Sequence, residues 1–438
     1  MESALQIWER NKEVIPGGVM SINRLMDPMR VFVRAKGAYL WDHEGKRYID
    51  YHAAFAPYLL GHGDDDVDGA VIDMIRSGAS LMGAGTTPWE GELARLIVAC
   101  VPSLDQVQVV NTGSEATFFA LRIARAATGR DEIVLMQGGY NGWADDVAFN
   151  LMDPKEALGD HRPGEEYTLR PISAGIPASV RQNVHAIEFN DLPAAEKVLQ
   201  SKKVAAVILE PILQNVGVVR PKPGYLEGLR ALCDRYGTLL VFDEVKTGFR
   251  HALGGWAAVS GVRPDLAAYG KACANGYPVG IVGGKREYMQ FCNHPDPKRK
   301  AVIAGTYSAH PFTVAAALAT LKKLKGRSAE IYGKLDALGE RMEKGLNDIF
   351  GRRNYPTTVV RQGSAFVVYF MDHTPESWAD IARNNDAQRD VQYRKALIER
   401  GIFHFPVTTK QGSISFAHSE ADIDETLKVT EEVVGRLA

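Results

Sequence analysis

Cysteine is scarce in this 438-residue chain, and neither sign of charge predominates. The four cysteines are scattered without C-x-x-C spacing, so the sequence predicts neither a zinc site nor a disulfide framework. Lys and Arg total 51 against 53 Asp and Glu, and a formal net charge of −2 favours neither nucleic acid nor an anionic membrane. The short run Asp64, Asp65, Asp66 is interpreted as solvated surface, and we expect no metal site.

Long apolar runs are also missing. No stretch of about eighteen apolar residues occurs, which excludes a membrane-spanning helix of ordinary length. Residues 1–13 are polar and carry no apolar signal core. We therefore expect a soluble cytoplasmic protein that works on small molecules rather than on nucleic acid or membranes.

The middle of the chain alternates short apolar runs with helical patterns. Such alternation predicts a mostly parallel sheet with helices on both faces. Strands are expected over 106–111, 132–136, 204–209 and 238–242, and helices over 114–127 and 225–236.

The two ends of the chain have a different pattern. Residues 31–51 show short strands broken by Gly37 and Gly45, and residues 360–438 mix strands (365–370, 413–416) with helices (391–400, 420–435). We predict an α/β protein with a large domain over 66–325. A smaller α+β domain would be built from both termini, namely the N-terminal segment 1–65 and the C-terminal domain 326–438.

Three loops that follow predicted strands carry residues that could bind a ligand or take part in catalysis. In such sheets, ligands bind at the carboxyl ends of the strands. Gly113 and Ser114 open a helix, which suits a phosphate, although taken alone an ordinary N-cap at Thr112 or Ser114 is the favoured interpretation. Asp243 ends a strand and is either a functional acid or a solvated one. Lys271 follows an apolar run and a glycine; it is either a desolvated amine that attacks carbonyls or a surface lysine.

Taken together, the three loops point to one cofactor. An anion site, a carboxylate and an amine are what pyridoxal 5′-phosphate (PLP) requires for its phosphate, its ring nitrogen and its aldehyde. The sequence therefore predicts a PLP enzyme.

The chain also resembles a known family over nearly its whole length. It is similar to class III aminotransferases of PLP fold type I, above all to the glutamate-1-semialdehyde aminomutases and the related β-amino-acid transaminases. The resemblance rests on ordered motifs, among them VVNTGSEATFFALRIARAATGRDEI (109–133), LRALCDRYGTLLVFDEVKTGFR (229–250) and PDLAAYGKACANGYPVGIVGG (264–284).

The resemblance implies a role for each matching position. Lys271 would form the Schiff base and Asp243 would pair with the ring nitrogen. Val245 and Tyr140 would cover the two ring faces, and Gly113 with Ser114 would hold the phosphate. Gln214 would lie near the ring oxygen, and Arg24 would bind the substrate carboxylate. Thr306 would contact the phosphate bound by the neighbouring subunit, which implies a homodimer with shared active sites.

Two departures from the family pattern bear on function. Asn141 stands where the family's Gly-Tyr-His-Gly stretch has histidine, and Lys410 stands near the place where the aminomutases carry a glutamate. We read Lys410 as solvent-facing, with contact to a carboxylate as the alternative. Loss of that acid favours a ping-pong transaminase that moves an amino group from a β- or ω-amino acid, or an amine, to a keto acid. The alternative is glutamate-1-semialdehyde 2,1-aminomutase or a related PLP isomerase.

Overall fold

The computed structural model describes residues 2–353 and 355–437. An eight-stranded sheet in the order β4-β11-β10-β9-β8-β5-β7-β6 forms its centre. The four neighbouring pairs from β10 to β7 are parallel, whereas β11 runs antiparallel to both of its neighbours. The strands are β4 Gln106–Val110, β5 Glu132–Met136, β6 Glu166–Tyr167, β7 Val184–Ile187, β8 Val204–Leu209, β9 Leu239–Asp243, β10 Leu266–Gly270 and β11 Gly280–Gly284.

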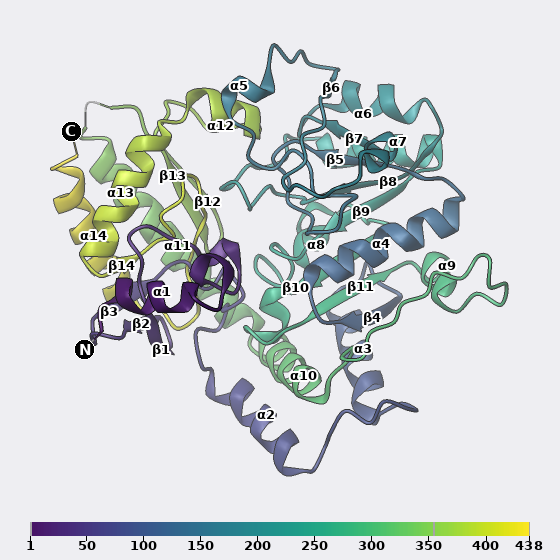
Figure 1. Ribbon diagram of the computed structural model, residues 1–438, viewed down its shortest axis with the longest axis horizontal. Coiled ribbons are helices and arrows are strands. Elements are labelled where there is room, and N and C mark those ends of the chain that lie inside the picture. The colour runs from purple at the N-terminus through teal and green to yellow at the C-terminus, as the bar shows by residue number, and fades with distance from the viewer. Residues whose placement is uncertain (1, 354, 438) are drawn as a thin grey trace.

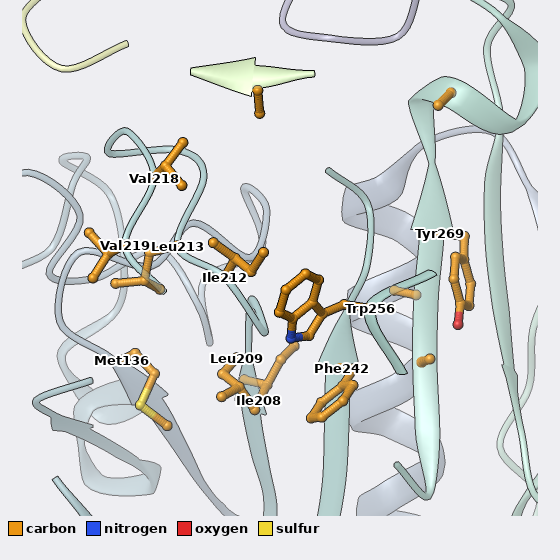
Figure 2. Packing of buried hydrophobic residues seen from close by; sticks show 14 of the residues in the cluster. Met136, Ile208, Leu209, Ile212, Leu213, Val218, Val219, Phe242, Trp256 and Tyr269 are labelled. Atoms are coloured by element: carbon orange, nitrogen blue, oxygen red, sulfur yellow. The ribbon is translucent and has the colours of Figure 1, made fainter. Parts of the chain in front are cut away.

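The predicted mostly parallel sheet is confirmed. Its central strands are buried at every position, as continuous apolar runs covered on both faces should be. Ile208, Phe242 and Trp256 lie in the resulting core (Figure 2). Helices connected with this sheet are α3 Pro88–Cys100, α4 Gly113–Thr128, α5 Lys155–Leu158, α6 Leu192–Leu199, α7 Tyr225–Tyr236, α8 Gly255–Ser260, α9 Arg286–Met289 and α10 Pro311–Gly326.

Residues from both ends of the chain share a smaller sheet. It has the order β1-β2-β3-β14, and its β14 runs parallel to β3. A further sheet has the order β12-β13-β15. The strands are β1 Phe32–Lys36, β2 Tyr39–Asp42, β3 Arg47–Asp50, β12 Thr358–Gln362, β13 Ala365–Tyr369, β14 Ile402–Phe403 and β15 Gly412–Ser413.

Helices cover these small sheets, and both chain termini lie on this side of the molecule (Figure 1). They are α11 Ser328–Phe350, α13 Ala387–Glu399 and α14 Glu420–Val434. The terminal segments also form α1 Ala4–Lys12 and α12 Trp378–Asn384, and α12 contacts α5. The domain boundaries at 65/66 and 325/326 stay a prediction. Over the described residues, no helix combines the length and apolar character needed to cross a membrane.

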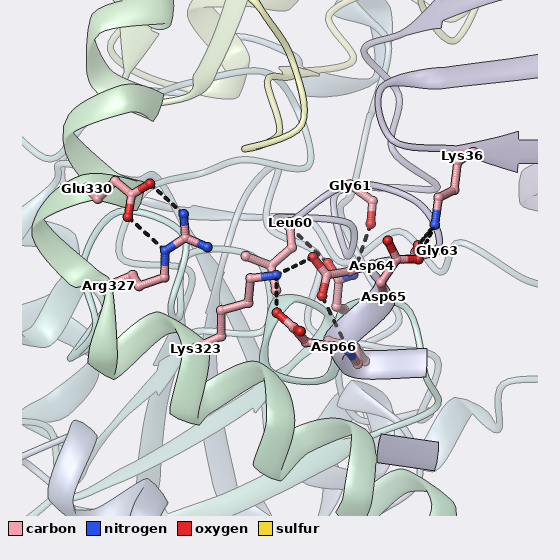
Figure 3. A network of polar contacts seen from close by, with 12 residues as sticks. Lys36, Leu60, Gly61, Gly63, Asp64, Asp65, Asp66, Lys323, Arg327 and Glu330 are labelled. Carbon is pink, nitrogen blue, oxygen red and sulfur yellow. Dashed lines mark hydrogen bonds and ion pairs between the residues drawn. The ribbon is translucent and has the colours of Figure 1, made fainter. Parts of the chain in front are cut away.

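The acidic run at 64–66 differs from its interpretation as plain solvated surface. Asp64 caps α2 (Asp65–Arg76) by accepting a hydrogen bond from the Val67 backbone N–H. Its side chain is only 11% exposed and forms an ion pair with Lys323 at 2.7 Å, which Asp66 shares (Figure 3). Asp65 and Asp66, whose side chains are 91% and 70% exposed, are solvated as the sequence suggested. The run therefore joins α2 to α10.

Candidate active site

The three loops singled out in the sequence meet in one cavity of about 540 Å³. Asp243 is the last residue of β9, Lys271 directly follows β10, and Gly113 comes three residues after β4. These strands point in the same direction, so their carboxyl ends lie at one edge of the sheet. The sheet thus brings an acid, an amine and a helix N-terminus to a common space.

The start of α4 is shaped for close approach. Thr112 caps the helix, and Glu115 completes a capping box with it. A Cβ on Gly113 would lie 2.6 Å from Val245 Cγ1, and one on Gly142 would lie 2.9 Å from Ser114 Oγ. The helix N-terminus, Ser114 and these two glycines form an open cradle with the polarity that an anion requires.

Asp243 is a buried acid, with 3% of its surface exposed. Its carboxylate accepts hydrogen bonds from Asn141 Nδ2 at 2.9 Å and from the Val245 backbone N–H at 3.0 Å. Burial is the main reason that the pKa of Asp243 is raised to about 7, and the nearby Glu210 adds to the shift. In the described part of the chain this carboxylate has no ion-pair partner within 4 Å, so a cationic ring nitrogen would complete it.

Lys271 begins the short 3₁₀ turn Lys271–Ala274 with φ of 48°, a left-handed conformation that is uncommon for lysine. Burial lowers the pKa of Lys271, and the negative charge of Asp243 opposes that shift in part. A lowered pKa increases the fraction of neutral amine, which is the nucleophilic form.

Tyr140 and Val245 line the same cavity. The Tyr140 backbone N–H donates to Glu210 at 3.0 Å, and burial raises the pKa of its phenol. Val245 packs against Gly113 and so also borders the anion cradle. Their roles against the two faces of a bound ring remain predictions.

Three predicted site residues do not line this cavity. The Gln214 side chain instead contacts His251 Nε2 at 2.6 Å. Arg24 is exposed, although its neighbours Ile22, Asn23 and Leu25 border the cavity. Thr306 is also exposed and lies in a second cavity of about 670 Å³, together with the segment Ser80–Thr87.

Several cavity residues escaped the sequence reasoning. Glu210 follows β8, whose carboxyl end lies at the same sheet edge, and Asn215 borders the cavity in place of Gln214. Lys246, three residues after Asp243, also lines it. Lys410 does so too, which makes its reading as a solvent-facing lysine wrong. The strand end after Leu209 was a signal that would have found Glu210.

Comparisons with known proteins agree with this arrangement. The family described as "Aminotransferase class-III" matches residues 21–416. Glutamate-1-semialdehyde 2,1-aminomutases of Chloroflexus aurantiacus and Methanothrix thermoacetophila are 40% and 37% identical to the chain. The alignments cover 96% and 98% of this chain and 94% and 95% of those proteins.

Solved structures superpose over 99% of the chain. An ω-transaminase from Sphaerobacter thermophilus has a TM-score of 0.89 at 30% identity, with 97% of that chain covered. A β-phenylalanine aminotransferase from Variovorax paradoxus has a TM-score of 0.84 at 27% identity, with 93% covered. A transaminase with PLP bound has a TM-score of 0.86 at 26% identity, with 97% covered.

Proposed function

Because the chain belongs to the class III aminotransferases and is a PLP-dependent enzyme, we propose that it is a transaminase that moves an amino group from a β- or ω-amino acid to a keto acid. The observation that carries this choice is Lys410. Its ammonium group lines the cavity. Lys410 stands near the position where the glutamate-1-semialdehyde aminomutases, which the sequence resembles, carry a glutamate.

The residues of the site fit the cofactor. The cradle at Gly113 and Ser114 would hold the phosphate, and the buried carboxylate of Asp243 would receive the ring nitrogen. Lys271 would hold the aldehyde carbon. When bound, PLP withdraws electrons from the substrate carbon that carries the amino group and so makes its proton acidic.

The chain's own side chains would then transfer the proton of that substrate carbon and hold the PLP ring in place. Lys271, as a neutral amine, would remove the proton from that substrate carbon, hold it on Nζ and release it later in the reaction, so that it acts first as a base and then as an acid. Asp243 would keep the ring nitrogen protonated, while Tyr140 and Val245 would fix the ring plane. Arg24, whose chain neighbours Asn23 and Leu25 line the cavity, is kept as a candidate for the substrate carboxylate because its guanidinium suits bidentate contact.

We further propose that the enzyme is a homodimer in which Thr306 contacts the phosphate bound by the neighbouring subunit. Two features support this: Thr306 lies outside the cavity of its own chain, and large apolar side chains are exposed around it. The resemblance assigns Thr306 the same role.

A second candidate is the isomerase glutamate-1-semialdehyde 2,1-aminomutase. It is favoured by the sequence relatives, which carry that name at 37–40% identity. Both reactions need the same cofactor residues. They differ in whether the amino group passes to a second molecule.

Product analysis with the purified, PLP-loaded enzyme separates the two. A panel of α-, β- and ω-amino acids would be incubated with and without a keto acid, and glutamate-1-semialdehyde would be incubated alone. We expect a new amino acid to form from the keto acid only when a β- or ω-amino acid is present. Conversion of glutamate-1-semialdehyde alone to the isomer with nitrogen on carbon 1, with no transfer to any keto acid, would overturn the proposal.

A further inference from the structure

Two lysines with no assigned role lie in the wall of the candidate active site, beside Lys271. Lys246 is only 6% exposed, and its ammonium donates to the backbone carbonyl of Gln214 at 2.7 Å. Lys410 donates to the carbonyl of the next residue, Asn215, at 3.0 Å. Both also line a small adjoining cavity, so the two ammonium groups share the same surroundings.

Neither ammonium group has a carboxylate partner. Across residues 2–353 and 355–437 no ion pair within 4 Å involves Lys246 or Lys410. Each ammonium carries three donors, and a single backbone carbonyl engages one of them. Lys410 also contacts the thioether of Met152 at 3.6 Å, and sulfur is a weak acceptor. Both groups therefore keep donor capacity inside the protein.

Burial makes these charges costly. It lowers the pKa of Lys410 to about 8 and that of Lys246 well below its usual range. The acid that acts on both is Glu210, and its carboxylate already accepts from the backbone N–H groups of Tyr140 and Gln214. An anion that enters the cavity would satisfy both ammonium groups and offset the cost of burying them.

The charges along the cavity wall favour an anion as well. Three lysines, Lys246, Lys271 and Lys410, line the cavity. Two acids, Glu210 and Asp243, line it with them. Once Lys271 and Asp243 hold the cofactor, two cations and one acid remain for the substrate. Phe55, Leu151, Phe405 and Val407 supply apolar surface around them. This combination suits an organic acid better than a simple amine.

We propose that Lys246 and Lys410 together bind a carboxylate of the substrate, which restricts the enzyme to amino and keto acids. The inference rests on the proposed function and names its substrate class. It is separate from the phosphate cradle at Gly113 and from the candidate role of Arg24, which is exposed outside the cavity wall.

Binding of an unreactive acid tests the site without turnover. Calorimetric titration of the PLP-loaded protein with glutarate and with its neutral analogue glutaramide measures what the charge contributes. We expect glutarate to bind more tightly. We also expect Lys246→Met and Lys410→Met each to weaken glutarate binding roughly 10- to 100-fold, as for loss of a charged hydrogen bond. Glutaramide binding should stay unchanged.

Matched variants guard against a purely structural effect. Lys410→Arg keeps the charge and should retain glutarate binding. Lys334→Met removes an exposed lysine that also donates to a backbone carbonyl, that of Phe416, away from the cavity, and should change nothing. The melting temperature of each variant shows that it is folded, and methionine is close to lysine in length.

The outcomes separate this inference from the function on which it rests. Equal binding of glutarate and glutaramide by the natural protein, or full glutarate binding in both methionine variants, overturns the site even if transamination is observed. If glutarate binding depends on both lysines but no donor passes its amino group to a keto acid, the site stands and the proposed function fails.

Discussion

Asn141 connects the carboxylate of Asp243 to the rest of the fold. Its side-chain amide donates to Asp243 Oδ2, while its backbone carbonyl accepts from the Thr117 hydroxyl at 2.6 Å. Both of these side chains are buried. Since burial already raises the pKa of Asp243 to about 7, the carboxylate form depends on such donors. The asparagine that replaces the family's histidine thus has a defined task.

We expect Asn141→Leu to weaken PLP binding roughly 10- to 100-fold, because a hydrogen bond to a charged group is lost while the volume is nearly kept. Equilibrium titration of the apoprotein with PLP, followed by absorbance, measures this. Asn141→His, which restores a ring N–H, should recover most of the affinity. Wild-type affinity in Asn141→Leu would show that the donor is unimportant.

The sequence was enough to predict some residues of the candidate active site, but not others that line the same cavity. Asp243 and Lys271 were found because each directly follows an apolar strand, which fixes its place at the sheet edge. Gln214 and Asn215 lie in an irregular loop, where the backbone path decides which of two adjacent polar side chains faces the cavity. Lys246 and Lys410 were harder still, because most lysines are exposed and burial is a property of the folded chain.

At the scale of the element, the sequence predicts the bounds of a helix or strand most accurately where its apolar residues follow one clear pattern. The strand expected over 204–209 is β8, and the helix over 225–236 is α7, with the same bounds. The strand expected over 413–416 pairs only at Gly412–Ser413, because the Ser415 backbone N–H donates to His418 instead of a neighbouring strand. β11 went unnoticed because three of its five residues are glycine.

The junction of α4 with β9 yields a prediction about packing. Gly113→Ala would place a Cβ 2.6 Å from Val245, so we expect a loss of about 1–3 kcal/mol of unfolding free energy and weaker PLP binding. Urea denaturation and PLP titration measure the two effects. Combining it with Val245→Ala should relieve the clash, so that the two changes are not additive.

A helix-interior glycine without close neighbours provides the control. Gly333 lies inside α11, and a Cβ there meets nothing within 4 Å. Gly333→Ala should stabilise the protein by up to about 1 kcal/mol through helix propensity. If Gly113→Ala behaved in the same way, the close approach at the cradle would be irrelevant.

The small sheets contain a buried histidine that links their stability to pH. His404, next to β14, stacks on Tyr51 with ring centroids 5.2 Å apart, and burial lowers its pKa to about 3. The unfolded chain takes up a proton near pH 6.5, whereas the folded chain does not. The stabilisation is therefore fully present above pH 6.5 and is lost as the pH falls towards 3.

We expect His404→Phe to reduce the acid sensitivity of the protein. Below pH 6.5 its unfolding free energy should fall less steeply than that of the natural protein, by about 1.4 kcal/mol per pH unit, because one proton fewer is taken up on unfolding. Urea denaturation at pH 7, 6 and 5 provides the two slopes. Parallel slopes would mean that His404 is protonated in the fold.

At the scale of the whole molecule, one region of the surface exposes large apolar side chains. Met82 is 66% exposed and Tyr307 63%. Met82 and Thr306 line the same second cavity, and Tyr307 directly follows Thr306 in the chain. Exposed apolar groups clustered around a concave surface are typical of an interface. A second copy of the chain is the occupant that would also bring Thr306 to a phosphate.

We therefore expect the natural protein to sediment as a dimer and Met82→Glu to shift it towards the monomer, because a buried unpaired charge opposes association. PLP affinity should fall with dimer content. Thr306→Ala should leave the dimer intact yet weaken PLP binding, which separates assembly from the phosphate contact. Val259→Glu, on an exposed residue of α8, serves as the control and should change neither property. Analytical ultracentrifugation with PLP titration decides the matter: a monomer that binds PLP as tightly as the dimer would exclude a shared site.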